Sequence, residues 1–194
     1  MITNFNKVSL VLSWIMRALL LAILLYETFY HNIVLSFASF FALILSLSPA
    51  IAKRTINARL PFVVDFAITL SLFLHIFGLA FNFYHDPDYY WWDQLTHFLG
   101  VAVIAFLSFM LIFTLTFLKK IKIPLWIAGV FIFSTALAVG ALWEVSEYYF
   151  DQIFGTASLG DIYDTVDDLV FDAIGGAVVA ILGVVYMSKR KYDE

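Results

Sequence analysis

Acidic residues and one histidine recur at helical spacing in three segments of this chain, and side chains of these types can hold a metal ion. The three segments carry Asp93 and His97; Glu144 and Glu147; and Asp164, Asp168 and Asp172. Residues three or four positions apart lie on one face of an α-helix. Several carboxylates and an imidazole projected from neighbouring helices are a familiar way to build a metal site.

The elements that must position these groups are transmembrane helices. The 194 residues are 63% hydrophobic and 13% charged, whereas soluble domains are about half apolar and about a quarter charged. A membrane-spanning helix needs about 20 mostly apolar residues. We therefore predict an all-α, polytopic membrane protein with a single transmembrane domain over residues 1–194, and six spans at residues 8–30, 33–51, 61–83, 94–118, 124–149 and 165–187.

The charges indicate which side of the membrane each loop faces. All Lys and Arg residues except Arg17 lie at alternate ends of the spans: Lys7; Lys53, Arg54 and Arg59; Lys119, Lys120 and Lys122; and Lys189, Arg190 and Lys191. Basic loops remain on the cytoplasmic side, so we predict cytoplasmic termini and acidic outer loops in the plasma (inner) membrane. Orientation and anionic lipid explain such short basic clusters, and no nucleic-acid partner is expected.

Three polar groups are expected at a similar depth below the outer membrane surface. With a rise of about 1.5 Å per residue, His97 and Asp168 lie one turn into their predicted spans, and Glu144 lies one turn below the outer end of its span. The three spans are consecutive in the chain, so we expect these side chains to converge. The groups expected in a shell above them are Asp93, Glu147 and Asp164.

The chemistry of this cluster is limited by the residues that are missing. There is no cysteine, which excludes disulfides, thiolate ligands and a cysteine nucleophile. No Lys or Arg accompanies the acids, and carboxylates held close together cannot all stay ionised unless protons or a metal ion join them. Mainly oxygen ligands with one nitrogen suit Zn, Mn, Mg or Fe better than Cu(I). We predict a divalent metal ion with the ligands His97, Glu144, Asp164 and Asp168.

Some of these residues also have an ordinary structural explanation. Asp93 and Asp164 stand at predicted helix starts, where aspartate caps free backbone N–H groups. His97 could form a simple bridge with Asp93. Asp172 lies deep enough that solvation would be costly, yet whether Asp161 and Asp172 join the site stays open.

Polar residues elsewhere in the spans are interpreted as structural. Arg17 is expected to extend to the inner membrane surface or to pair with Asp65. His75, in the middle of the third span, is interpreted as a buried, hydrogen-bonded residue. Glu27 and His31 are one turn apart near the outer face, where a place at the interface is the stronger interpretation.

The polar segments resemble a known family. WWDQLTHFLG (91–100), ALWEVSEYY (141–149) and GDIYDTVDDLVFDAIGG (160–176) resemble the YjdF-type inner-membrane proteins, multi-span proteins with no established reaction. The family motifs, W-D-x-x-x-H, E-x-x-E and G-D-x-x-D-T-x-x-D, fall on Trp92, Asp93, His97, Glu144, Glu147, Gly160, Asp161, Asp164, Thr165 and Asp168. Asp167 and Asp172 lie outside these motifs, which argues against Asp172 as an essential ligand. The resemblance extends over residues 60–185, with a looser similarity to VanZ-like membrane proteins.

Three classes of function remain open. In an enzyme, the metal ion would activate water or polarise a phosphate oxygen of a lipid or lipid-linked headgroup, with Glu147 or Asp93 as general base or as the partner that orients His97. In a cation or proton transporter, the acids would attract cations, although the inner halves of the spans offer only Asp65 and His75. In a structural or accessory protein, a metal ion or protonated acids would tie the last three spans together. The sequence does not distinguish between these three classes, and it does not determine the oligomeric state.

Overall fold

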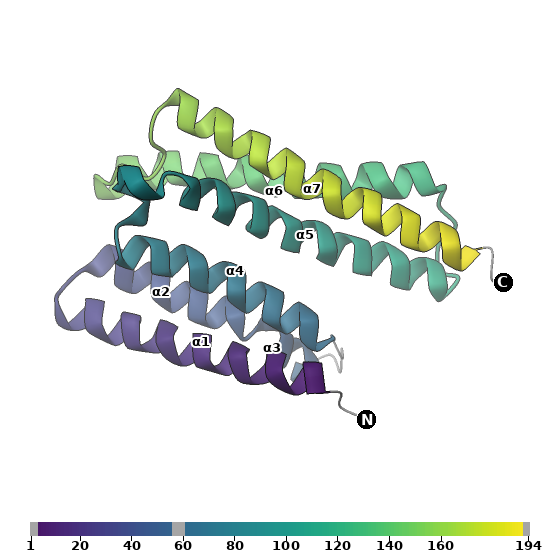
Figure 1. The fold of residues 1–194 in the computed structure, drawn as a ribbon, viewed down its shortest axis with the longest axis horizontal. Helices are drawn as coiled ribbons and strands as arrows, with labels where there is room; N and C mark the ends of the chain where they lie inside the picture. Colours follow the sequence, from purple (N-terminus) through teal and green to yellow (C-terminus); the bar gives the residue numbers. More distant parts are fainter. Residues whose placement is uncertain (1–3, 56–60, 192–194) are drawn as a thin grey trace. The chain divides into compact units, whose positions relative to one another are not determined.

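The computed structural model describes residues 4–55 and 61–191, and this part of the chain is helical and contains no strand (Figure 1). The predicted all-α class is confirmed. Arg59, one of the predicted cytoplasmic residues, lies outside the described residues. In chain order the elements are α1 (Asn4–Phe29), α2 (Ile33–Ser46), α3 (Ser48–Thr55), α4 (Phe62–Ala80), the short 3₁₀ helices η1 (Phe83–His85) and η2 (Pro87–Tyr89), α5 (Trp91–Phe117), α6 (Leu125–Phe154) and α7 (Ile162–Lys191).

Among the described residues, five helices are long and apolar enough to cross a membrane: α1, α4, α5, α6 and α7. This agrees with a multi-span membrane protein. The predicted span over residues 33–51 is not one continuous helix, because α2 ends at Ser46 after 14 residues and α3 begins at Ser48. Pro49 explains the break, since a proline has no N–H to donate to the carbonyl of Leu45, four residues earlier. Six spans are therefore not established by helix length alone.

The chain forms two compact units, Met1–Trp92 and Asp93–Glu194. In the first unit α1, α2 and α4 pack against one another. Their shared apolar contacts centre on Leu20, Ala42 and Ile76, one from each helix. In the second unit α5, α6 and α7 share a larger apolar core that contains Val101, Ala105, Phe109, Ile112, Ala128, Ile132, Ala136, Ala180 and Met187.

A buried arginine joins the three helices of the first unit. Arg17 of α1 is only 4% exposed, and its Nη2 lies 2.6 Å from Oδ1 of Asp65 on α4. The same nitrogen donates hydrogen bonds to the carbonyl oxygen of Ser46 at 2.5 Å and to Oγ1 of Thr69 at 3.0 Å. The predicted Arg17–Asp65 pair is confirmed. Because the guanidinium also binds a carbonyl in the last turn of α2, it stabilises the α2–α3 break.

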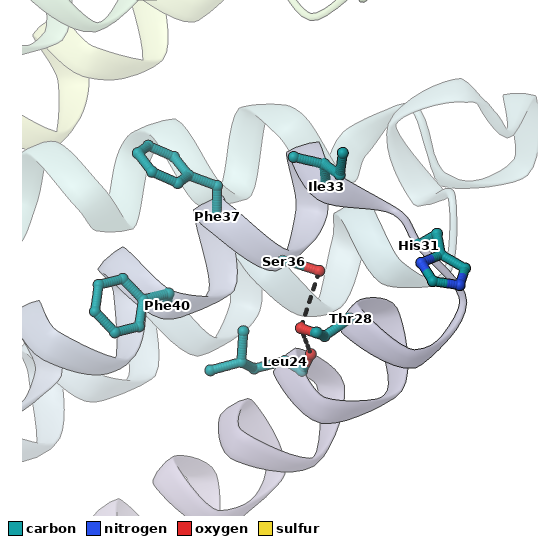
Figure 2. A pocket seen from close by; sticks show the side chains of 7 residues that line it. All are labelled: Leu24, Thr28, His31, Ile33, Ser36, Phe37 and Phe40. Atoms are coloured by element: carbon teal, nitrogen blue, oxygen red, sulfur yellow. Dashed lines mark hydrogen bonds between the residues drawn. The ribbon is translucent and has the colours of Figure 1, made fainter.

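A groove of about 430 Å³ lies along α1 and α2 in the first unit (Figure 2). Its two hydroxyl groups are satisfied locally: Thr28 Oγ1 donates to the carbonyl of Leu24, and Ser36 Oγ donates to the carbonyl of Asn32. The groove therefore presents mainly hydrocarbon, as expected of a surface that faces lipid tails. Its lining residues are Leu24, Thr28, His31, Ile33, Ser36, Phe37 and Phe40.

Helices α6 and α7 extend further than the sequence indicated, and the loop between them is shorter than the predicted segment 150–164. Helix α6 continues to Phe154 and ends where Gly155 takes the left-handed conformation, with φ of 67°, which glycine adopts without steric cost. Asp161, rather than Asp164, caps the start of α7, since its Oδ1 accepts hydrogen bonds from the backbone N–H groups of Tyr163 and Asp164.

Candidate metal centre

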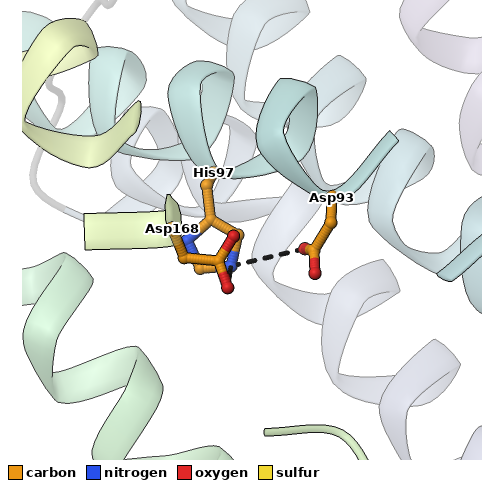
Figure 3. A group of neighbouring side chains, drawn as sticks. All are labelled: Asp93, His97 and Asp168. Atoms are coloured by element: carbon orange, nitrogen blue, oxygen red, sulfur yellow. Dashed lines mark ion pairs between the residues drawn. The ribbon is translucent and has the colours of Figure 1, made fainter. Parts of the chain in front are cut away.

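The second unit brings His97 together with carboxylates from all three of its helices. On α5, Asp93 lies one turn before His97, and Nε2 of His97 is 3.5 Å from Oδ1 of Asp93 (Figure 3). The same nitrogen is 3.6 Å from Oε1 of Glu144 on α6 and 3.8 Å from Oδ2 of Asp168 on α7. The predicted convergence of His97, Glu144 and Asp168 is thus present in the structure.

These separations fit ligands around a metal ion better than hydrogen bonds. An N–H···O hydrogen bond spans about 2.7–3.2 Å, and a contact of 3.6 Å does not count as one. Nitrogen and oxygen ligands bind Zn²⁺ at about 2.0–2.2 Å in a tetrahedron, whose ligand atoms are then about 3.4 Å apart. The ligand atoms of Asp93, His97 and Asp168 all lie within 4.8 Å of one another. This group of three can therefore converge on one cation.

The cluster is removed from solvent, which raises the cost of its charges. His97, Glu144 and Asp168 are 8%, 5% and 2% exposed, whereas the side chain of Asp93 is 20% exposed. Both carboxylate oxygens of Glu144 are buried without a hydrogen-bond partner. A buried ionised group in that state costs several kcal/mol unless a cation or proton accompanies it. The unpartnered oxygens of Glu144 therefore indicate that either a cation or a proton accompanies this carboxyl group.

The charge surrounding His97 is strongly unbalanced. No Lys or Arg occurs within α5 or α6, and Lys189 on α7 follows Asp172 by 17 residues, a distance of about 26 Å along a helix. Among the described residues of helices α5, α6 and α7, the imidazole is therefore the basic group that lies at the cluster, and it faces four carboxylates. One imidazolium cannot neutralise four carboxylates, so protons or a divalent cation must account for the remainder.

Three residues that the sequence suggested lie outside the group of three: Glu144, which still contacts His97, and Glu147 and Asp164. The indole Nε1 of Trp143 donates a hydrogen bond of 2.9 Å to Oε1 of Glu147. The carboxylate of Asp164 lies against the backbone of Gly160, where an added Cβ would clash with it. Neither Glu147 nor Asp164 is among the ion-pair contacts of His97. Their predicted roles, Glu147 as general base and Asp164 as ligand, stay predictions.

Asp172 is the residue whose position sequence reasoning undervalued. It is fully buried, and its Oδ1 lies 3.3 Å from Nδ1 of His97, the shortest of the contacts of that ring with a carboxylate. The sequence signal for a place in the site was its spacing from Asp168, because residues four positions apart lie on one face of a helix. Its absence from the family motifs pointed the other way. Only the packing of α7 against α5 shows that the two residues meet.

Close approach of the helices makes this meeting possible. A Cβ added at Gly175 of α7 would lie 2.6 Å from the backbone oxygen of Phe98, the residue after His97. Small residues allow helix backbones to come this near in a membrane protein. Any larger residue at position 175 would push α7 away from α5 and separate Asp172 from His97.

The loop before α7 is fixed by one carboxylate. Asp151, near the end of α6, accepts hydrogen bonds from Thr156 Oγ1 and from the backbone N–H groups of Ser158 and Leu159, at 2.5, 2.8 and 2.9 Å. These bonds order the turn that leads into the Asp161 cap. Asp151 was not singled out from the sequence, and its role here is to set the start of the helix that carries Asp168.

Comparison with known proteins agrees with this architecture. No curated protein and no solved structure matches the chain. The model of one family, described as "Predicted membrane protein (DUF2238)", matches residues 11–189. This match fits the resemblance to YjdF-type proteins and does not show the similarity to VanZ-like proteins. Because the match covers nearly the whole chain, the protein belongs to this family of membrane proteins.

Proposed function

We propose that this protein holds a divalent metal ion at His97 and uses it as a hydrolase or transferase on a lipid or lipid-linked headgroup. The observation that carries the proposal is the arrangement around Nε2 of His97, which faces carboxylates from three helices at 3.5–3.8 Å. Zn, Mn, Mg and Fe all accept such a set of oxygen donors with one imidazole.

The ligand arrangement favours catalysis over a purely structural tether. Asp93, His97 and Asp168 form the compact group of three, and catalytic zinc sites typically use three protein ligands with water in the fourth position. Glu144, with both oxygens free of hydrogen bonds, lies beside His97. Glu144 would either complete the ligand set or act as a general base toward the water that a bound metal ion would activate.

The surroundings of the site favour a lipid substrate and weigh against transport. Below the cluster, α5, α6 and α7 pack through an apolar core that includes Ala105, Ile132 and Ala180. A transported cation would have to pass this core, where unpaired charge is costly. A lipid headgroup could instead reach the metal ion beside the partly exposed Asp93. The lack of Lys or Arg in α5 and α6 favours a headgroup without net negative charge.

Metal analysis together with a turnover assay tests this function. Protein purified in detergent is expected to retain about one divalent ion per chain, and the metal-loaded protein should convert one class of membrane lipid, detected by mass spectrometry. Removal of the metal by a chelator should stop the reaction, and return of Zn²⁺ or Mn²⁺ should restore it. If the protein binds metal but converts no lipid class, the enzyme is excluded and the metal would serve only as a structural tether. If the protein binds no metal, both the metal-dependent enzyme and the metal tether are excluded.

We further propose that α2 and α3 together make a sixth crossing, with both termini in the cytoplasm of a plasma-membrane protein. Supporting this, Leu47 between the two helices is hydrogen-bonded to both: its N–H donates to the carbonyl of Ile44 in α2 at 3.1 Å, and its carbonyl accepts from the N–H of Ile51 in α3 at 3.0 Å. The natural absence of cysteine provides a clean test. A cysteine placed at Lys120 should react with an impermeant maleimide only in opened cells, whereas one placed at Asp88 should react in intact cells. The reverse pattern would refute this orientation.

A further inference from the structure

The two ring nitrogens of His97 have different surroundings. Nε2 faces the carboxylates of Asp93, Glu144 and Asp168 at 3.5–3.8 Å. Nδ1 faces only one of the described carboxylates, Oδ1 of Asp172, at 3.3 Å. A metal ion bound at Nε2 cannot be reached by a group on the opposite side of the ring. Asp172 is therefore separated from the proposed ligands by the imidazole itself.

Asp172 can play a defined role from that side. When the carboxylate of Asp172 is ionised it can only accept hydrogen bonds, and Nδ1 of His97, 3.3 Å away, is then the donor. In a neutral imidazole this leaves the lone pair on Nε2, the nitrogen that faces the other carboxylates. Histidines that bind metal ions commonly donate their second N–H to such a carboxylate, which fixes the tautomer and the orientation of the ring.

The chain also provides the space that Asp172 needs. A Cβ added at Gly140 of α6 would clash with Oδ2 of Asp172 and lie 2.6 Å from its Cγ. This Oδ2 is buried without a hydrogen-bond partner, and Asp172 as a whole is 0% exposed. The carboxylate is thus confined between the ring of His97 and the backbone of α6. Gly140 permits a position of Asp172 that an alanine would obstruct.

We propose that Asp172 is a positioning residue that holds the His97 ring with Nε2 directed at the metal ion, and that Gly140 provides the space for it. This inference rests on the proposed metal centre. It assigns Asp172 to the outer sphere, so its loss should weaken metal binding without abolishing it. Outer-sphere partners of this kind typically contribute about 10–100-fold to metal affinity.

Binding of Co²⁺ to the full-length protein in detergent tests the inference, because the visible spectrum of Co²⁺ reports the geometry of its ligands. Asp172→Leu should lower the Co²⁺ affinity about 10–100-fold and change the spectrum of the bound ion. Asp172→Asn has the same shape and can still accept the hydrogen bond from Nδ1–H, so it should recover most of the affinity and the original spectrum. If Asp172 had a purely structural role, Asp172→Leu would lower the thermal stability of the metal-free protein and leave the spectrum of bound Co²⁺ unchanged.

Gly140→Ala tests the same contact with Asp172 retained. It should shift the Co²⁺ spectrum in the direction of Asp172→Leu. The matched control is Gly129→Ala on the same helix, whose added Cβ would meet only the end of the Val184 side chain at 3.0 Å, and it should leave the spectrum unchanged.

Each remaining outcome is decisive. Unchanged Co²⁺ affinity in Asp172→Leu would overturn the positioning role, and complete loss of binding in Asp172→Asn would make Asp172 a ligand instead. If the unsubstituted protein binds no Co²⁺, Zn²⁺ or Mn²⁺, the proposed metal centre itself fails.

Discussion

Replacing His97 with alanine is expected to lower the affinity for Zn²⁺ or Mn²⁺ by more than about 100-fold, which exceeds the usual effect of an outer-sphere partner. His97 supplies the nitrogen donor of the proposed site, and its ring contacts Asp93, Glu144, Asp168 and Asp172. Without the imidazole the site loses its nitrogen ligand and the group that all four carboxylates contact. Elemental analysis of the purified variant and titration of the metal-free protein would measure the loss.

A matched control for this variant is His85→Ala. His85 belongs to η1 in the first unit, and its side chain is exposed. The control should retain the metal content of the unsubstituted protein and its thermal stability. Equal metal content in the His97 and His85 variants would show that bound metal resides elsewhere in the chain. It would remove the basis of the proposed function.

The second large effect is expected for Arg17→Met in the first unit. The substitution would leave the carboxylate of Asp65, whose side chain is only 14% exposed, without its cation and would remove the hydrogen bonds to Ser46 and Thr69. Breaking a buried ion pair by removing one partner costs about 3–5 kcal/mol. We expect the free energy of unfolding in detergent to fall by this amount, measured by denaturant titration followed by circular dichroism.

A double variant separates the pair from the arginine itself. Replacing a buried pair with apolar residues of similar volume is often neutral, so Arg17→Met combined with Asp65→Leu should recover much of the lost stability. Arg54→Met, at an exposed position of α3, serves as the control and should change stability little. Wild-type stability in Arg17→Met would contradict a stabilising role for the buried pair.

The extent of the helices was predictable where composition alone decides it. Long apolar runs must form helices in a bilayer, because every backbone polar group there has to be hydrogen-bonded internally. This reasoning located both ends of α1, α4, α5, α6 and α7 to within about five residues. The largest difference is at the outer end of α6, which continues past the predicted residue 149 to Phe154 and ends at the Gly155 turn; the start of α7 follows the Asp161 cap. Those ends depend on local hydrogen bonds, to which a count of apolar residues is insensitive.

The region around residues 33–51 shows a second limit. Its composition is apolar throughout, so it is indistinguishable from a span by hydropathy. Its helix ends at Ser46, because Pro49 follows and Arg17 binds the Ser46 carbonyl from another helix. The sequence contains the proline, but only the packing of α1 against α2 brings the guanidinium to the break.

The sequence by itself determined that this is a helical membrane protein, and it placed His97, Glu144 and Asp168 at one depth, because hydropathy and helical rise are properties of the chain alone. The tertiary structure decided which nitrogen of His97 faces which carboxylate, and it brought Asp172 rather than Asp164 against the ring. That choice depends on how closely and at what rotation the helices pack. Gly140 and Gly175 permit this packing because neither has a Cβ, which would clash with Asp172 or with the backbone of Phe98. These contacts are therefore defined only once the neighbouring helices are in place.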